Sequence, residues 1–329
     1  MKNIAIIGSG SWGVAIAIHL AKLGHKVKLW AFSEEDIKAI TEKRECRFLP
    51  NIKIPDTVEA TLDYKEAIEG SEIIVHVTPS KFVRENVQKY KQYVTKQPIV
   101  MCSKGFELST LYTLNEVVEE EIPGCKVAVL SGPSHAEEVS IGIPTAIVVA
   151  SKHNDVIDLI QNTFSSPTLR LYSTNDVRGV ELGGSLKNII AFCAGISKAL
   201  NLGDNSFAAL LTRGLAEITR LGVKMGGERE TFYGLTGLGD LVVTCGSEHS
   251  RNRKAGMLIG SGKTLEETKQ EVGMTIESID NIEVAHKLAQ KYEIEMPIVE
   301  TVYDVLYNGL NPREAVNILM TRKLKQERE

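Results

Sequence analysis

The sequence predicts an α/β protein in which a doubly wound parallel sheet is followed by an all-α domain. Short apolar runs alternate with helical patterns from residue 3 to about residue 174, and only long helical patterns follow. A glycine-rich turn stands directly after the first apolar run. We therefore predict a dinucleotide-binding domain over residues 1–178 and a helical substrate domain over residues 179–329, with the catalytic cleft between them.

The bulk properties exclude several classes of function. The 329 residues suffice for roughly two domains, and a net charge of −4 gives no general attraction to nucleic acid or to an anionic membrane. No stretch reaches about 18 apolar residues, so no membrane span is predicted. The five cysteines are scattered without a C-x-x-C pair, which favours reduced thiols in a cytoplasmic protein. No metal site is predicted.

The first strand is expected over Asn3–Ile7, and the turn behind it reads Gly-Ser-Gly-Ser-Trp-Gly (8–13). A helical pattern over 14–23 and a second strand over 26–30 complete a βαβ unit with G-x-G-x-x-G in the required place. In this context Gly8, Gly10 and Gly13 provide a tight turn, bare backbone near a pyrophosphate and close helix packing. We expect a Rossmann dinucleotide site; the alternative is a glycine-rich turn with no ligand.

The end of the second strand normally distinguishes NAD from NADP. An acid there binds the ribose 2′-hydroxyl, whereas a basic residue accommodates a 2′-phosphate. Here the chain reads Trp-Ala-Phe-Ser-Glu-Glu (30–35), with neither type in the first positions. Glu34 and Glu35 are compatible with the start of the next helix, so the sequence leaves the choice between NAD and NADP open.

Further strands are expected over 72–77, 99–102, 127–130, 146–149 and 169–172. Strands that alternate with helices predict a parallel sheet, in which ligands gather at the carboxyl ends of the strands. Lys104 and the segment 131–136 directly follow two of these strands, so both should face the cofactor. The alternative for Lys104 is a solvated loop lysine.

The second half predicts helices over 176–200, 206–225, 252–259, 277–292, 298–307 and 313–321. No proline-rich or serine-rich linker precedes them, so we expect a packed interface between the domains. The stretch 182–197 is almost wholly apolar or small, which is typical of an interior helix.

Lys187 is the one charge in this apolar stretch. In a helix its side chain leans over Gly183 and Gly184, where a ligand could come close. A buried ammonium is costly without an anionic or polar partner, which makes Lys187 a site candidate. The alternative is a lysine that extends to solvent.

Two polar stretches interrupt the helical half. The first covers residues 235–241 (Leu-Thr-Gly-Leu-Gly-Asp-Leu) and is predicted to be a glycine-flanked loop that presents Asp240. The alternative is that Asp240 caps the next segment. In the second stretch Ser250 looks like an N-cap, and Arg251, Arg253 and Lys254 follow in the first turn. Cations at this end of a helix invite an anion such as phosphate; the alternative is a solvated basic turn.

Seven stretches together resemble one family, and they are Gly-Ser-Gly-Ser-Trp-Gly (8–13), Arg-Phe-Leu-Pro (47–50), Ser-Lys-Gly (103–105), Ser-Gly-Pro-Ser (131–134), Gly-Gly-Ser-Leu-Lys-Asn (183–188), Gly-Leu-Gly-Asp-Leu (237–241) and Ser-Arg-Asn-Arg (250–253). In this order along nearly the whole chain, they resemble the NAD(P)-dependent glycerol-3-phosphate dehydrogenases of the bacterial type. The resemblance implies reversible reduction of dihydroxyacetone phosphate, a phosphorylated triose, to sn-glycerol 3-phosphate for phospholipid synthesis, with NADP or NAD as cofactor. It is also compatible with a homodimer.

The resemblance implies that Lys187 is the catalytic acid/base. It implies cofactor contacts for Gly8, Gly10, Ser11, Trp12, Gly13, Phe32, Lys104, Ala136, Arg251, Thr275 and Glu277. It implies substrate contacts for Lys104, Gly132, Ser134, Lys187, Asp240, Ser250, Arg251 and Asn252. This sequence departs at Phe32, where many relatives carry His or Arg, and at Thr275, where valine is usual.

Two other functions are compatible with a dinucleotide-binding domain. Related two-domain dehydrogenases of 3-hydroxy acids or phosphogluconate usually carry an asparagine four residues after the catalytic lysine, but here that residue is Ala191. A regulator that senses NAD(P) without chemistry would not need Lys187, Asp240 and Arg251 in one cleft. Both alternatives are therefore less favoured than the dehydrogenase.

Overall fold

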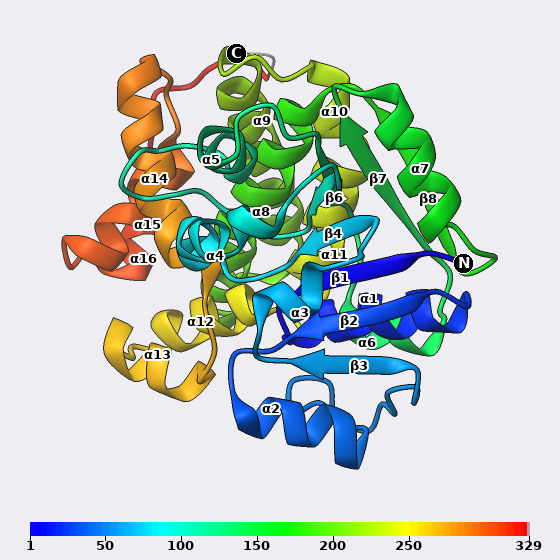
Figure 1. Cartoon of the computed structure of the whole chain (residues 1–329). Helices are drawn as coiled ribbons and strands as arrows, with labels where there is room; N and C mark the ends of the chain where they lie inside the picture. Colours follow the sequence, from blue (N-terminus) through cyan, green and yellow to red (C-terminus); the bar gives the residue numbers. More distant parts are fainter. Residues whose placement is uncertain (328–329) are drawn as a thin grey trace.

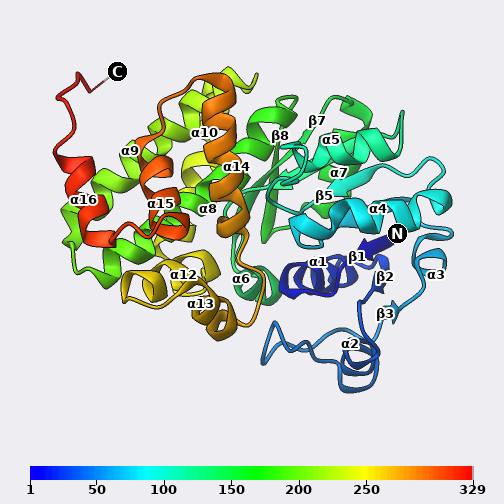
Figure 2. The same cartoon turned by 90° about the vertical axis from the view of Figure 1, so that its left-hand side faces the viewer.

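The computed structural model describes residues 1–327, so the last two residues of the predicted second domain lie outside it. Figure 2 shows a sheet with helices on both faces, next to a separate group of helices. The predicted fold class is confirmed: a mostly parallel α/β sheet comes first and an all-helical part follows.

Within the described residues one sheet has eight strands in the order β3-β2-β1-β4-β5-β6-β7-β8. The strands are β1 (Asn3–Ile7), β2 (Lys26–Trp30), β3 (Val58–Thr61), β4 (Ile73–His76), β5 (Ile99–Met101), β6 (Val127–Ser131), β7 (Thr145–Ser151) and β8 (Leu169–Thr174). The strand order reverses between β1 and β4, which is where such sheets bind ligands. The sequence did not predict β3, an edge strand in which only Val58 is buried.

The expectation of a wholly parallel sheet is wrong at one edge, because β7 runs antiparallel to β6 and β8 then pairs parallel with β7. The connecting helix α6 (Ala136–Ile141) has six residues. At about 1.5 Å per residue it advances about 9 Å, whereas five residues of β6 span about 16 Å. The next strand, β7, therefore starts near the carboxyl end of β6 and runs in the opposite direction.

Helices cover both faces of the sheet (Figure 1). One apolar core includes Ile4 and Ile6 of β1 and residues of α1 (Ser11–Lys22) and α7 (Asn154–Phe164). The other includes Ala5 and Ile7 with residues of α3 (Tyr64–Ile68), α4 (Val83–Tyr90) and α5 (Leu114–Glu121). Because both faces are buried, the strands appear in the sequence as continuous apolar runs.

The helical part packs around α8 (Val177–Ala199), in which all residues from 179 to 192 are buried. The predicted interior helix is thus confirmed. The helices that surround or extend it are α9 (Gly203–Lys224), α10 (Arg229–Tyr233), α11 (Asp240–Gly246), α12 (Arg251–Gly260), α13 (Leu265–Val272), α14 (Glu277–Tyr292), α15 (Pro297–Tyr307) and α16 (Pro312–Met320).

The loop expected over 235–241 is instead helical. A π-helical turn, Leu235–Gly239, runs directly into α11, and Asp240 is the first residue of that helix. A Cβ on Gly237 would lie 2.0 Å from the carbonyl oxygen of Phe232. Gly237 therefore allows two backbone segments to pack closely, and it does not mark an open loop.

Helices α8 and α12 touch through their backbones. A Cβ on Gly195 would lie 2.0 Å from the Arg253 carbonyl oxygen, and one on Gly256 would lie 1.8 Å from the Phe192 carbonyl oxygen. No larger residue fits without moving a helix. This crossing fixes the first turn of α12 beside the middle of α8.

Gly256→Ala should lower the free energy of unfolding by about 1–3 kcal/mol, because the added methyl group must separate α8 from α12. Gly246→Ala is the control, since a Cβ there meets no atom within 4 Å. Urea denaturation should place the control within about 0.5 kcal/mol of the native protein. Equal stability of the two variants would contradict the close crossing.

Candidate active site

The candidate site lies where α8 passes the carboxyl ends of the parallel strands. The loop after β5 is bound to α8, since the Ser185 hydroxyl accepts from the Gly105 N–H (2.9 Å) and donates to the Gly105 carbonyl (3.2 Å). The loop is also tied to the end of β4, because Ser103 Oγ donates to the Thr78 carbonyl (2.5 Å). The loops of two neighbouring strands thus meet the interior helix.

The predicted glycine turn has the geometry of a phosphate cradle. Gly8 has a φ of +129°, and a Cβ on it would lie 2.8 Å from the Val77 carbonyl oxygen. A Cβ on Gly13 would lie 2.0 Å from the Gly8 carbonyl oxygen, so α1 approaches the strand closely. Larger side chains would break this turn.

The N-terminus of α1 is open. The N-cap residue, Gly10, has no side chain that could bond the first backbone amides of the helix. A Cβ on Gly10 would meet no atom within 4 Å. The backbone amides at Ser11 and Trp12 therefore face a space beside the helix N-terminus, where the helix dipole favours an anion. These residues fit the pyrophosphate of a dinucleotide.

At the end of β2, the side chain of Phe32 is 81% exposed. Ser33 caps the helix α2 (Glu34–Lys38), so Glu34 and Glu35 belong to its first turn. The aromatic face of Phe32 therefore stands free at the position where the adenosine half of a dinucleotide lies in such sheets.

Three charged side chains form the centre of the site. Asp240 lies between two lysines: Lys187 Nζ donates to its Oδ1 at 2.8 Å, and Lys104 Nζ donates to its Oδ2 at 2.6 Å. Lys187 also donates to Thr244 Oγ1 at 2.5 Å, and Lys104 to the Gly132 carbonyl at 3.2 Å. Lys104 comes from the sheet domain and the other two charges from the helical part, so the cluster joins the two.

Burial controls the proton affinity of Lys187, which is only 6% exposed. Burial lowers its pKa to about 8; Asp240 opposes that shift, and the like charge of Lys104 adds to it. Burial alone would raise the pKa of Asp240, but Lys104 and Lys187 outweigh it and hold that pKa below its ordinary value. The carboxylate stays ionised, and Lys187 changes charge near neutral pH.

The sequence suggested that a ligand could come close to Lys187 over the two glycines that precede it. The structure shows that this side of α8 is occupied by protein. A Cβ on Gly184 would lie 2.6 Å from Ser131 Oγ, and one on Gly183 would lie 3.2 Å from the Thr236 carbonyl oxygen. Other parts of the protein fill this side of α8. The alternative that Lys187 extends to solvent is also wrong, because the side chain is buried.

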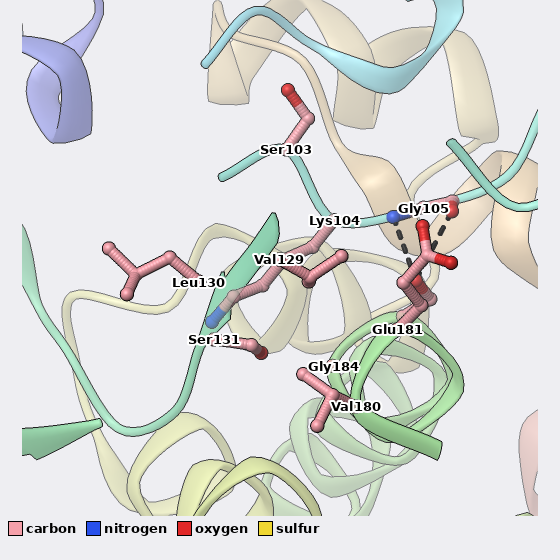
Figure 3. Close-up of a pocket in the computed structure, with 10 residues that line it drawn as sticks. Ser103, Lys104, Gly105, Val129, Leu130, Ser131, Val180, Glu181 and Gly184 are labelled. Carbon is pink, nitrogen blue, oxygen red and sulfur yellow. Dashed lines mark hydrogen bonds between the residues drawn. The ribbon is translucent and has the colours of Figure 1, made fainter. Parts of the chain in front are cut away.

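Figure 3 shows the side chain of Lys104 extending over the end of β6 beside Ser131, with Gly184 of α8 nearby. The cavity behind Lys104 has a volume of only about 10 Å³. That is room for no more than about one water molecule. This cavity is therefore too small for a substrate, and a ligand must reach the lysines from another side.

The N-terminus of α12 is the candidate anion site. Ser250 is its N-cap, as predicted, and its hydroxyl accepts from the Arg253 N–H (3.2 Å). Arg251 is exposed and gives one N–H to the Thr275 carbonyl (3.1 Å). Asn252 donates to Asn188 Oδ1 (3.0 Å), which places this turn next to Lys187. The side chains of Ser250 and Asn252 are thus already bonded within the protein.

The remaining predicted residues follow β6 or bond the loop after β4. Ser134 Oγ donates to the Gly132 carbonyl (3.0 Å), and Ala136 begins α6 directly behind them. Glu277 accepts hydrogen bonds from the backbone and the hydroxyl of Ser80, in the loop after β4. Glu277 therefore ties the helical part to the sheet at the strand beside the glycine turn.

Sequence reasoning missed Thr244 and Ser80. Thr244 stands four residues after Asp240, on the same face of α11, and the spacing would have indicated it had the segment been taken as helical. Ser80 carried no signal, because its partner Glu277 is far away in the sequence.

Comparison with known proteins decides the family. Models described as the N-terminus and the C-terminus of NAD-dependent glycerol-3-phosphate dehydrogenase match residues 3–157 and 176–317. The glycerol-3-phosphate dehydrogenase (NAD(P)+) of Fusobacterium nucleatum is 48% identical over 331 residues, which covers 99% of each chain. The chain belongs to the NAD-dependent glycerol-3-phosphate dehydrogenase family.

Other relatives agree with this assignment. A glycerol-3-phosphate dehydrogenase (NAD(P)+) from Thermoanaerobacter is 50% identical, covering 99% of this chain and 98% of that one. The crystal structure of glycerol-3-phosphate dehydrogenase from Coxiella burnetii is 40% identical, with a TM-score of 0.94 over 98% of this chain and 99% of that one. The predicted family, enzyme class and NAD(P) dependence are confirmed: the chain is an oxidoreductase of the glycerol-3-phosphate dehydrogenase family.

Among residues 1–327, no helix is long and apolar enough to span a membrane. The same residues contain no group of three or more His, Cys, Asp or Glu side chains that could hold a metal ion.

Two substitutions should move the pKa of Lys187 in opposite directions. Asp240→Asn removes the neighbouring anion, so the pKa should fall below about 8, whereas Lys104→Met removes a like charge, so it should rise. Nitrogen NMR of lysine-labelled protein measures both. Shifts of the same sign in the two variants would refute this description of the cluster.

Proposed function

We propose that the chain reduces dihydroxyacetone phosphate to sn-glycerol 3-phosphate, and catalyses the reverse reaction, with Lys187 as the proton donor and acceptor. One observation carries the proposal: a buried lysine with a lowered pKa is held by Asp240, which also binds Lys104 from the loop at the end of β5. When bound, the nicotinamide supplies the hydride for reduction and accepts it in oxidation.

Lys187 retains one proton for a ligand. An ammonium has three N–H donors, and Asp240 and Thr244 take two of them. The third is the one that reaches a carbonyl oxygen as negative charge develops on that oxygen, and it can be transferred there. In the reverse direction neutral Lys187 takes the proton from the alcohol.

Asp240 and Lys104 position this proton. The Asp240 carboxylate accepts from Lys187, Thr244 and Lys104, so it orients the ammonium and stays ionised throughout. Of the two possible roles for Asp240, holding the lysine or holding substrate hydroxyls, these contacts favour the first. Lys104 also keeps one N–H for the substrate, since two are given to Asp240 and Gly132.

The phosphate group of the substrate belongs at the first turn of α12. Arg251 has guanidinium donors beyond the one given to Thr275, and the helix N-terminus adds backbone amides. The bond between Asn252 and Asn188 joins this turn to the residue after Lys187. A phosphate bound there would orient the carbonyl of a three-carbon substrate toward Lys187.

On this proposal the product supplies phospholipid synthesis. The five free cysteines support a reducing compartment, the cytoplasm, as the place of action.

The substrate class is tested directly. Purified protein should oxidise NADH or NADPH with dihydroxyacetone phosphate and hardly at all with hydroxypyruvate or succinic semialdehyde. The two comparison substrates represent the related dehydrogenases of hydroxy acids. The reverse order of activity would refute the proposed function.

Lys187→Met should lower kcat by about 10²–10⁴-fold, because the proton donor is lost while the buried alkyl chain is retained. Cofactor affinity, measured by titration of protein fluorescence, should stay the same. Lys198→Met, an exposed position on the same helix, is the matched control. A native kcat in the Lys187 variant would remove this residue from the mechanism.

A further inference from the structure

Two histidines, one from each half of the chain, face each other at the edge of the site. His135 follows β6 and stands between Ser134 and Ala136, while His249 precedes Ser250 in the turn before α12. Their ring centroids are 5.8 Å apart, with the ring planes at 59°. Neither ring has a role in the mechanism above.

The Nε2 atom of His135 is buried and has no hydrogen-bond partner among the described residues. Buried polar atoms are almost always bonded, so this nitrogen needs a partner, and beside an active site a substrate oxygen can be that partner. The tilted ring of His249 lies beside the ring of His135. His249 is exposed and belongs to the short turn between α11 and α12, so its side chain has room to move aside.

The charged groups around His135 come from three helices. Burial lowers the pKa of His135, and Lys187 of α8 adds to that effect. Glu137 and Glu138 of α6 and Asp240 of α11 oppose it. With its pKa below the usual 6.5, the ring is neutral at pH 7 and offers one N–H donor.

We propose that Nε2 of His135 donates a hydrogen bond to the phosphate group of the substrate, which binds next to the paired rings of His135 and His249. The inference rests on the proposed function. The neighbours of the two histidines support the assignment, because Ser134 and Ser250 flank them and Arg251 begins α12 next to Ser250. His135 then distinguishes phosphorylated from unphosphorylated three-carbon substrates.

The test compares three variants of His135 by steady-state kinetics. His135→Phe keeps an aromatic ring but removes the donor, so KM for dihydroxyacetone phosphate should rise at least about tenfold, with kcat little changed. His135→Gln places an amide near the position of Nε2 and should restore most of the affinity. His135→Asn places its amide near Nδ1 and should behave like the phenylalanine variant.

Unphosphorylated dihydroxyacetone separates a phosphate contact from a structural role. The kcat/KM for dihydroxyacetone should be the same in the native protein and in His135→Phe, because this substrate has no phosphate group that His135 could bind. His153→Gln is the histidine control. His153 follows β7, which runs antiparallel to β6, so His153 lies near the amino end of β6, away from His135.

A native KM in His135→Phe, or an equal loss with both substrates, would overturn the inference. If the phenylalanine variant does not fold, equal KM values for the glutamine and asparagine variants would overturn it. The proposed function would survive either result as long as the native protein reduces dihydroxyacetone phosphate.

Discussion

The ion cluster of Lys187, Asp240 and Lys104 is the interaction on which the rest of the site depends. Two buried charges of opposite sign, Lys187 and Asp240, stabilise each other in a place where either alone would be costly. Lys104 adds a third charge from the other half of the chain. The cluster therefore sets the proton affinity of Lys187 and also holds the helical part against the strand ends. Chemistry and domain packing share the same contacts.

Two features of the fold bring the residues of this cluster together. Strands β7 and β8, which run parallel to each other and antiparallel to β6, lead the chain into α8, and Gly184 of α8 then meets the end of β6 at Ser131. The glycine contacts between α8 and α12 bring the first turn of α12 to α8, where Asn252 bonds Asn188, the residue after Lys187. A buried helix with an interior charge would be unstable alone, and it is these neighbours that supply its partners.

The sequence predicted the features that depend on local pattern. The βαβ unit with its glycines, the interior helix around Lys187 and the N-cap at Ser250 were all visible in residue type and spacing. Features that depend on distant contacts were not. The reversed strand β7 follows from the length of α6, and the helical form of 235–241 follows from packing of Gly237 against Phe232. The bond between Ser80 and Glu277 joins residues that no local pattern connects.

The most direct test of the central claim is the pH dependence of kcat in both directions. Lys187 must be protonated to reduce the ketone and neutral to oxidise the alcohol. With a pKa of about 8, reduction should decline and oxidation should increase as pH rises through that value. The same pH dependence in both directions, or inflections only near the ordinary lysine value of about 10.4, would contradict the account.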